Sequence, residues 1–198
     1  RSLLAGAGVG STGIFWGGAT ATNTLLNKTT RINSSGAAIG AETNVGTVRG
    51  GPAGTRVGDY GLFYGGWATA TTDTNKTTRI STLGALVGSE TSVGTSRAQS
   101  SAATLNAYAV IWGGLNNSGG VNYGNNSVTV ISSSGTLVQS ETSVGVNNWT
   151  QGSGGAGANM ICSGGTTTIR LTASYTYAGT TTLGTEVEDS MYNTGAST

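Results

Sequence analysis

Short apolar runs separated by glycine-rich and polar segments recur along the whole chain. In the first part of the chain these runs occupy residues 13–17, 28–33, 37–45 and 49–57. β-Branched and aromatic residues are frequent in the runs, and Gly, Asn and Ser stand between them, which is typical of β-strands joined by tight turns. No segment repeats its apolar residues every 3.6 positions, as an amphipathic helix does. The pattern therefore predicts an all-β protein of antiparallel strands.

The apolar pattern repeats with a period of about 48 residues. An apolar triplet followed by Gly-Gly occupies residues 14–18, 62–66 and 110–114, and a degenerate copy occupies residues 161–165. Self-similarity at such a period is the signature of a repeat architecture. Each period is expected to form four strands, so the chain is interpreted as a single repeat domain, 1–198. Its units are roughly 1–48, 49–96, 97–147 and 148–198.

The order of motifs within a unit carries a family resemblance. In the second unit, residues 61–66 read Gly-Leu-Phe-Tyr-Gly-Gly, a Thr-Thr-Arg-Ile strand follows, residues 86–94 end in a small-residue turn, and Arg97 opens an Ala-rich strand. This order resembles the kelch repeat and is most similar to the Gly/Thr-rich kelch-like repeats of phage virion proteins such as tail fibres and appendages. It departs from ordinary kelch repeats because residues 37–45 and 85–93 hold no Trp. The resemblance covers the whole chain and implies four-stranded antiparallel blades in a small β-propeller.

The resemblance raises the question of how the ring closes. Residues 1–9 precede the first Gly-Gly motif and are expected to be the fourth strand of a unit. In the simplest arrangement this N-terminal strand completes the blade that begins near Ala158 and closes the propeller, which removes exposed sheet edges. In the alternative, four repeats form half of a ring, or stacked subunits lend strands to one another. The sequence leaves both arrangements open.

Charge and composition exclude several classes of catalytic and binding site. The chain has 9 Lys and Arg, 8 Asp and Glu, no His and one Cys. Because His is the commonest general base and metal ligand near neutral pH, its absence excludes Ser-His-Asp catalysis and a His-ligated copper site. A zinc site needs several Cys or His ligands, and nine scattered cations make no nucleic-acid footprint. We expect no enzyme activity, no metal or other cofactor, no nucleic-acid partner and, without an apolar stretch of about 18 residues, no membrane insertion.

The recurring charged residues are interpreted as structural. A catalytic group is needed once, whereas contacts between repeat units need the same group in each unit. The residues concerned are Glu42, Glu90 and Glu141 with Arg49 and Arg97. Four cations that alternate with threonine are expected on a solvated face: Lys28, Arg31, Lys76 and Arg79. The loop at residues 73–75 offers one carboxylate to a hard cation and is interpreted as a plain turn.

Two sets of equivalent residues are expected in the core. Phe15, Phe63, Ile111 and Cys162 each stand two positions before a Gly-Gly pair, so Cys162 is interpreted as a buried, inert thiol. The next residue in each of the three clear copies points to the opposite face of the strand. These residues are Trp16, Tyr64 and Trp112, which are also expected to pack between blades.

The third unit contains an insertion that marks a candidate binding loop. The Gly-Gly pair and the Asn before the next strand are nine positions apart in the first two units and twelve apart in the third. Insertions in repeat arrays map to loops, often on a binding face, and amide and aromatic side chains suit hydrogen bonding and stacking. The candidate partner or receptor-binding residues are Asn116, Asn117, Asn122, Tyr123 and Asn125, with Trp67 and Trp149 as weaker candidates. A tolerated insertion without function is the alternative.

These observations favour a non-catalytic virion or extracellular structural protein. The leading hypothesis is a phage appendage or decoration subunit that presents loops to a host surface. The alternatives are a secreted, lectin-like propeller that binds carbohydrate and the subunit of a microbial surface filament. The expected partners are other virion or filament subunits, further copies of the same chain, and a glycan or protein of the host surface.

Overall fold

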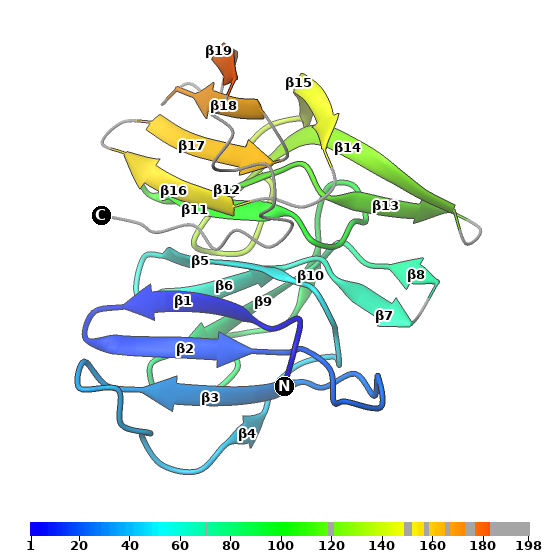
Figure 1. Ribbon diagram of the computed structural model, residues 1–198. Coiled ribbons are helices and arrows are strands. Elements are labelled where there is room, and N and C mark those ends of the chain that lie inside the picture. Colours follow the sequence, from blue (N-terminus) through cyan, green and yellow to red (C-terminus); the bar gives the residue numbers. More distant parts are fainter. Residues whose placement is uncertain are drawn as a thin grey trace.

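The computed structural model describes residues 1–69, 71–118, 121–148, 152–156, 159–164, 167–172 and 177–182. Within these ranges every regular element is a β-strand, and all paired strands are antiparallel (Figure 1). The prediction of an all-β, antiparallel protein is confirmed. In this part of the chain no helix is long and apolar enough to cross a membrane.

Four antiparallel sheets follow one another along the chain. The first contains β1 (Ala5–Val9), β2 (Thr12–Trp16), β3 (Lys28–Ile32) and β4 (Thr43–Asn44). The second contains β5 (Ala53–Val57), β6 (Tyr60–Tyr64), β9 (Lys76–Ser81) and β10 (Thr91–Ser92). The third contains β11 (Ser101–Leu105), β12 (Tyr108–Trp112), β14 (Val121–Ile131) and β15 (Thr142–Asn148), and β13 (Leu115–Ser118) pairs with β14. The fourth contains β16 (Gly152–Ala156), β17 (Asn159–Gly164), β18 (Thr167–Leu171) and β19 (Tyr177–Thr182), and β7 (Trp67–Thr69) and β8 (Thr72–Asp73) form a separate hairpin.

A tight hairpin begins each of the first three sheets. Val9 of β1 pairs with Thr12 of β2, which leaves a two-residue turn whose first residue, Gly10, has φ +58°. Gly58 and Asn106 occupy the same position in the next two sheets, with φ +55° and +56°. Gly and Asn are the residues that accept this left-handed conformation in two-residue hairpin turns.

The position of β1 in this hairpin differs from the position expected for closure of the propeller. The turn folds β1 back onto β2 of its own sheet, and the fourth sheet is built from its own strands, β16 to β19. The prediction that the N-terminal strand completes the fourth unit is therefore wrong. For the same reason the run at 49–57 supplies β5, the first strand of the second sheet, and not the last strand of the first.

The predicted strand at 37–45 is also shorter than expected. Only Thr43–Asn44 is paired as a strand, and Ala38 makes an isolated bridge to Ile32. Gly40, between these two pairings, has φ +66°, and Gly88 repeats this value within a degree at the equivalent position of the next unit. Because an extended strand does not contain a left-handed residue, the strand is interrupted at this glycine.

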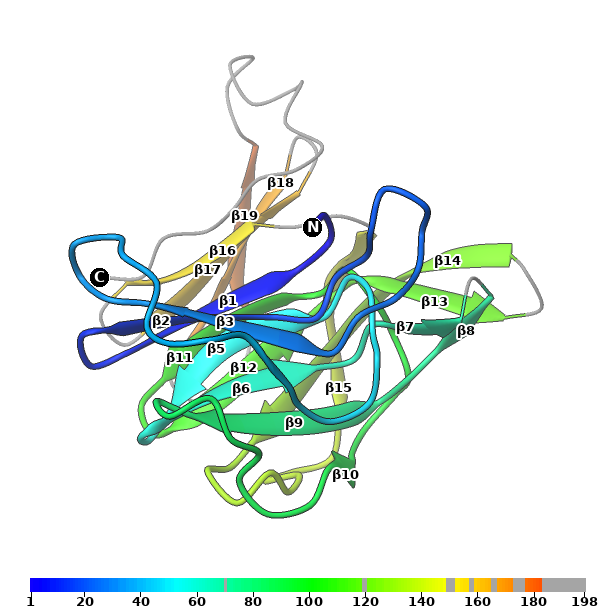
Figure 2. The ribbon, with the colours of Figure 1, turned by 90° about the horizontal axis from the view of Figure 1, so that it is seen from below.

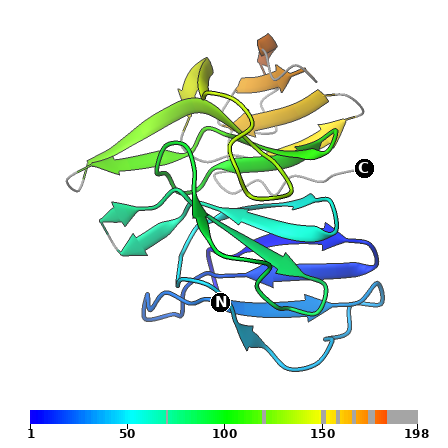
Figure 3. The same cartoon turned by 180° about the vertical axis from the view of Figure 1, so that it is seen from behind.

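The sheets pack face to face in chain order. β1 lies beside β5, β5 beside β11, and β11 beside β16. Figure 1 shows the first sheet at the bottom and the fourth at the top, and the view from behind shows the same order (Figure 3). We call the face that a sheet turns toward the next sheet its rear face, and the opposite face its front face.

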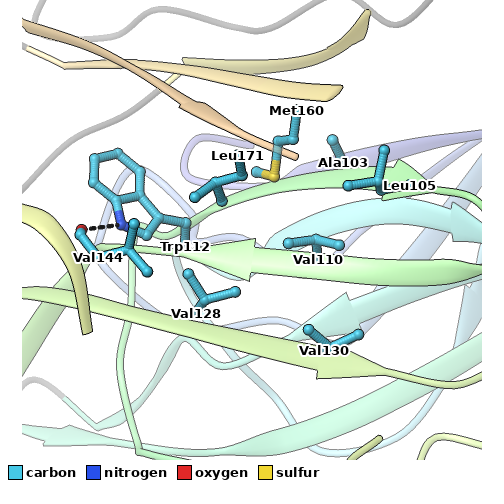
Figure 4. Packing of buried hydrophobic residues seen from close by; sticks show 9 residues of the cluster. All are labelled: Ala103, Leu105, Val110, Trp112, Val128, Val130, Val144, Met160 and Leu171. Atoms are coloured by element: carbon cyan, nitrogen blue, oxygen red, sulfur yellow. Dashed lines mark hydrogen bonds between the residues drawn. The ribbon is translucent and has the colours of Figure 1, made fainter. Parts of the chain in front are cut away.

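Three hydrophobic clusters lie between consecutive sheets. The first joins the rear residues Ala5, Ala7, Val9, Ile14, Trp16 and Val45 to the front residues Phe63 and Ile80. The second joins Ala53, Val57, Leu62 and Tyr64 to Ala109, Ile111 and Ile131. The third joins Ala103, Leu105, Val110, Trp112, Val128, Val130 and Val144 to Met160 and Leu171 (Figure 4). The sheets are therefore held together by apolar burial on alternate residues of their strands.

The rear-face aromatic residues are fully buried, as predicted: Trp16, Tyr64 and Trp112. The Nε1–H of Trp112 donates to the carbonyl of Val144 at 3.1 Å (Figure 4), and that of Trp16 donates to the carbonyl of Val45 at 2.8 Å. A buried indole N–H needs such a partner. In each of these two sheets, the bond connects the last segment of the sheet to the indole ring on its second strand.

Of the residues that stand two positions before a Gly-Gly pair, those of the second and third sheets are buried as predicted. Phe63 and Ile111 are fully buried, as predicted. Phe15 is partly exposed, so the prediction is wrong there, because no sheet in the described part of the chain covers the front face of the first sheet. The side chain of Cys162 lies outside the described residues.

Candidate functional site

The recurring arginines lie between consecutive sheets. The guanidinium of Arg49 stacks on the ring of Trp16 in the first sheet, 4.4 Å from its centroid. In the second sheet it donates to the carbonyl of Gly65 at 2.9 Å and to Oε1 of Glu90 at 3.0 Å. The Arg49 side chain is completely buried. Arg49 therefore contacts two sheets at once, by a cation–π contact on one side and an ion pair on the other.

Arg97 repeats this arrangement one unit later. Its guanidinium lies 5.5 Å from the ring centroid of Tyr64 in the second sheet. In the third sheet it donates to the hydroxyl of Thr129 and to Oδ1 of Asn125 at 3.3 Å, and it lies 3.7 Å from Oε1 of Glu141. Burial lowers the pKa of Arg97, and burial lowers the pKa of Arg49 to about 10, so Arg49 remains protonated at neutral pH.

The glutamate partners receive donors both from their own sheet and from the segment that precedes it. Glu90 accepts from the backbone N–H of Thr47 at 3.2 Å and from its hydroxyl, in the segment between the first two sheets, and from the hydroxyl of Thr78 in the second sheet. Burial raises the pKa of Glu90, but the bonds from Thr47 and Thr78 and the charge of Arg49 outweigh it, so the pKa lies below its ordinary value. The pKa of Glu141 is lowered in the same way, against burial, by Thr129, Thr95 and Arg97. This geometry agrees with the structural interpretation for Arg49, Arg97 and their glutamate partners. Glu42, in contrast, bonds to Arg1, Lys28 and Thr30 of its own unit.

The four cations expected on a solvated face are exposed or partly exposed. Lys28 is exposed and Lys76 is half-buried. Nη1 of Arg31 donates to the carbonyl of Thr82 at 3.2 Å, and Nη1 of Arg79 donates to that of Ser133 at 3.0 Å. Each acceptor lies in a turn of the next unit, so Arg31 and Arg79, which are partly exposed, also make contacts between units.

The insertion in the third unit forms a two-stranded ribbon. Leu115–Ser118 pairs with the first residues of β14, so that Asn116 faces Tyr123 and Asn117 faces Asn122. The ribbon extends from the same side of the molecule as the β7–β8 hairpin of the second unit (Figures 1 and 2). Of the candidate residues, Tyr123 is the one exposed side chain within the described part, at 56%, and Val121 beside it is 52% exposed.

The other candidate residues anchor the ribbon. Nδ2 of Asn116 donates to the carbonyl of Ser96 at 3.2 Å. Oδ1 of Asn125 accepts from Arg97 at 3.3 Å and from the backbone N–H of Ser127 at 2.6 Å. These contacts connect the base of the ribbon to the interface between the second and third sheets.

The aromatic candidates do not gather beside Tyr123. Trp67 is hydrogen-bonded through its backbone to Gly50 and lies against Gly51, where a Cβ atom would come within 3.0 Å of the indole ring. Trp67 is therefore a packing residue of the second unit. Trp149 and the side chain of Asn122 lie outside the described residues.

Asp73 links the two ribbons, a contact that the sequence did not reveal. Its Oδ2 accepts from the backbone N–H of Asn117, 44 residues away, and its side chain is 8% exposed. Burial raises the pKa of Asp73, and the bond from Asn117 partly offsets this. Within the described ranges its Oδ1 has no hydrogen-bond partner, and no group of three acidic, His or Cys side chains is placed to hold a metal ion. The only sequence signal was the lone carboxylate in an otherwise neutral loop.

Comparison with known proteins supports the fold alone. No family model and no curated protein matches the chain. The fold is similar to that in the structure of YjhT, with a TM-score of 0.68 and 10% sequence identity. The similarity covers 92% of this chain and 66% of that chain.

Proposed function

We propose that the chain is a non-catalytic structural and adhesion module of a virion or another extracellular appendage. In this proposal the four sheets are successive blades of a kelch-like propeller array, and the ribbon of the third unit is presented to a host surface. The observation that carries the proposal is the exposed aromatic ring of Tyr123. Tyr123 lies on an anchored ribbon, and this connection is longer than the corresponding connections of the first two units.

The charged residues support the non-catalytic part of this proposal. Arg49 and Glu90 bind each other and the backbone of neighbouring sheets. A catalytic acid or base needs a position from which it reaches a substrate. Groups that are buried between sheets, repeated in consecutive units and bonded to internal partners suit a scaffold.

A carbohydrate-binding, lectin-like module is the second candidate. Tyr123 lies opposite Asn116 and next to Asn122 in the chain, and an aromatic face beside amide groups is a combination that binds sugars by stacking and hydrogen bonding. A receptor of protein character would use the same exposed ring together with Val121.

Adhesion is tested with the purified chain on intact host cells and on an array of microbial surface glycans. We expect Tyr123→Ala to weaken binding by about tenfold or more, because an exposed aromatic anchor commonly contributes more than 1 kcal/mol. The matched control is Leu83→Ala, since Leu83 is 78% exposed on a turn of the second unit. Binding to glycans favours the lectin, and binding to cells alone favours a protein receptor. Equal binding by Tyr123→Ala and the wild type would contradict the proposal.

A further inference from the structure

Asparagine residues in the pattern Asn-x-Ser/Thr recur along the chain. This pattern is the acceptor sequence for N-linked glycosylation, in which a sugar is attached to the side-chain amide nitrogen of the asparagine. The asparagines that begin such a pattern are Asn27, Asn33, Asn75, Asn116, Asn125 and Asn148. In a chain rich in Asn, Ser and Thr the pattern also arises by composition, so the surroundings of each amide must distinguish an acceptor from a structural residue.

Two of these asparagines occupy equivalent positions in the first two units and stabilise the fold. Nδ2 of Asn27 and Nδ2 of Asn75 each donate to a backbone carbonyl at 2.7 Å. The threonines two positions later, Thr29 and Thr77, are each 1% exposed. A glycosyltransferase has to reach both the amide and the hydroxyl of the pattern. In the folded chain these two patterns are therefore closed to it.

The asparagines at the base of the third-unit ribbon are also engaged. Nδ2 of Asn116 donates to the carbonyl of Ser96, and Oδ1 of Asn125 accepts from the buried guanidinium of Arg97. Both asparagines are partly buried. Their amides position the ribbon. The side chain of Asn148 lies outside the described residues.

Asn33 has different surroundings. It begins the turn after β3, and both Asn33 and Ser35 are exposed. Oδ1 of Asn33 accepts from the backbone N–H groups of Ser35 and Ala37 at 3.0 and 2.9 Å, and from the hydroxyl of Ser35 at 2.7 Å. Three donors on Oδ1 fix the orientation of the amide. Among the described residues Nδ2 has no partner, so it is the free group of this amide.

The exposure of this turn is a property of its position in the repeat. Backbone hydrogen bonds of the same pattern close the turns that begin at Asn33, Ser81 and Ser132. Leu83 occupies the position of Ser35 in the second unit and is 78% exposed, although the first sheet packs on the second. Because Ser stands in place of Asn33 in the second and third units, the first unit alone of these three presents an acceptor pattern at this turn.

We propose that Asn33 is an attachment site for an N-linked sugar, supplied by a glycosyl diphosphate donor such as a nucleotide sugar or a lipid-linked oligosaccharide. In this transfer Nδ2 forms a bond to C1 of the sugar. The bond between C1 and the phosphate oxygen breaks, and the diphosphate leaves with the electron pair. The proton of Nδ2 passes to a base of the transferase. The hydroxyl of Ser35 donates to Oδ1 and stabilises the negative charge that this oxygen gains as Nδ2 loses its proton.

A sugar at Asn33 leaves the ribbon of the third unit free. The turn after β3 lies at the left of the molecule in Figures 1 and 2, whereas β7–β8 and β13–β14 lie at the right. The modification therefore adds a bulky, polar group to the surface without covering Tyr123. Modification of Asn33 and host binding by Tyr123 are separate proposals, and each is tested without the other.

The test offers the folded full chain to two purified enzymes that read Asn-x-Ser/Thr. One is a soluble N-glycosyltransferase with UDP-glucose, and the other is an oligosaccharyltransferase with a lipid-linked oligosaccharide. Peptide mass spectrometry measures the rate at each asparagine, relative to a short synthetic peptide around the same residue. We expect Asn33 to react at least about tenfold faster than Asn27 and Asn75, because those two need local opening of the fold. The enzyme that modifies Asn33 identifies the class of donor.

Two variants of Ser35 provide the matched control. Ser35→Ala keeps Asn33 but removes the hydroxyl and should abolish the modification, whereas Ser35→Thr should retain it. Circular dichroism verifies that both variants are folded. The proposal is overturned if Asn33 of the folded wild type stays unmodified by both enzymes, or if Asn27 and Asn75 react as fast as Asn33. Modification of Ser35→Ala at the wild-type rate would also contradict it.

Discussion

At the scale of single residues, a few large buried side chains join neighbouring sheets. The guanidinium of Arg49 is enclosed by Trp16 on one side and by Gly65 and Glu90 on the other. Burying this charge is costly, and the ion pair and hydrogen bonds offset the cost. Removal of one partner leaves the other buried and uncompensated, which is the situation that destabilises a protein most.

Glu90→Gln tests this balance against Glu42→Gln at the equivalent position. We expect Glu90→Gln to lower the free energy of unfolding by about 3 kcal/mol, because it leaves Arg49 without a counter-charge. Glu42→Gln should change it by less than about 1 kcal/mol, since the Arg1–Glu42 pair is partly exposed. Urea unfolding at neutral pH measures both values. Equal effects of the two substitutions would contradict the role assigned to Arg49.

The lowered pKa of Glu90 adds a pH dependence to the same experiment. In the unfolded chain a Glu titrates near about 4.3, and in the folded protein the pKa of Glu90 lies lower. The stability that Glu90 contributes is therefore fully present above the unfolded value and is lost as the pH falls through the folded value. The difference between the wild type and Glu90→Gln should shrink in acid, and a constant difference would be inconsistent with the ion pair.

At the scale of elements, a buried carboxylate connects the two ribbons. Asp73 joins the β7–β8 hairpin to the longer ribbon through the N–H of Asn117. Because the carboxylate is buried with one oxygen unpaired, its ionised form is disfavoured. The link between the ribbons therefore requires a buried charge at neutral pH, which lowers the stability of the folded protein.

Asp73→Asn should therefore stabilise the protein at neutral pH. The amide oxygen still accepts from Asn117, while the charge is removed. Because the folded pKa of Asp73 is raised, the stability of the wild type falls as the pH rises through the titration range of this carboxyl group. The stability difference between Asp73→Asn and the wild type should therefore shrink in acid, where Asp73 is protonated. Differential scanning calorimetry should show an increase of about 3 °C at neutral pH. A decrease at neutral pH would mean that the charge itself stabilises the ribbons.

Sequence reasoning identified the elements better than their pairing. The strands around the Gly-Gly motifs and the buried Trp16 and Phe63 followed from the alternation of apolar residues. The place of β1 did not: Gly10-Ser11 is a two-residue hairpin signal, but the repeat order of the resemblance assigned this strand to the end of a unit. The contact of Asp73 with Asn117 joins distant units, so neither local pattern nor spacing indicated it.

At the scale of the whole molecule, four similar sheets pack one on the next in chain order within the described residues. Each internal interface contains an apolar cluster, and the first two add a buried arginine at the same repeat position. Stability in such arrays is approximately the sum of the units and their nearest-neighbour interfaces. The contacts of Arg49 with Glu90 and of Arg97 with Glu141 give the recurrence of these residues a structural reason.

A double-mutant cycle between Trp16 and Arg49 tests this claim most directly, because Trp16 lies in the first sheet and the Arg49 guanidinium is bonded to Glu90 and Gly65 of the second unit. The cycle compares Trp16→Leu, Arg49→Met and the double variant by urea unfolding. For a desolvated cation–π contact we predict a coupling free energy of about 2 kcal/mol between the two sites. A coupling below about 0.5 kcal/mol, the range of independent sites, would contradict the account in which the buried arginine joins one sheet to the next.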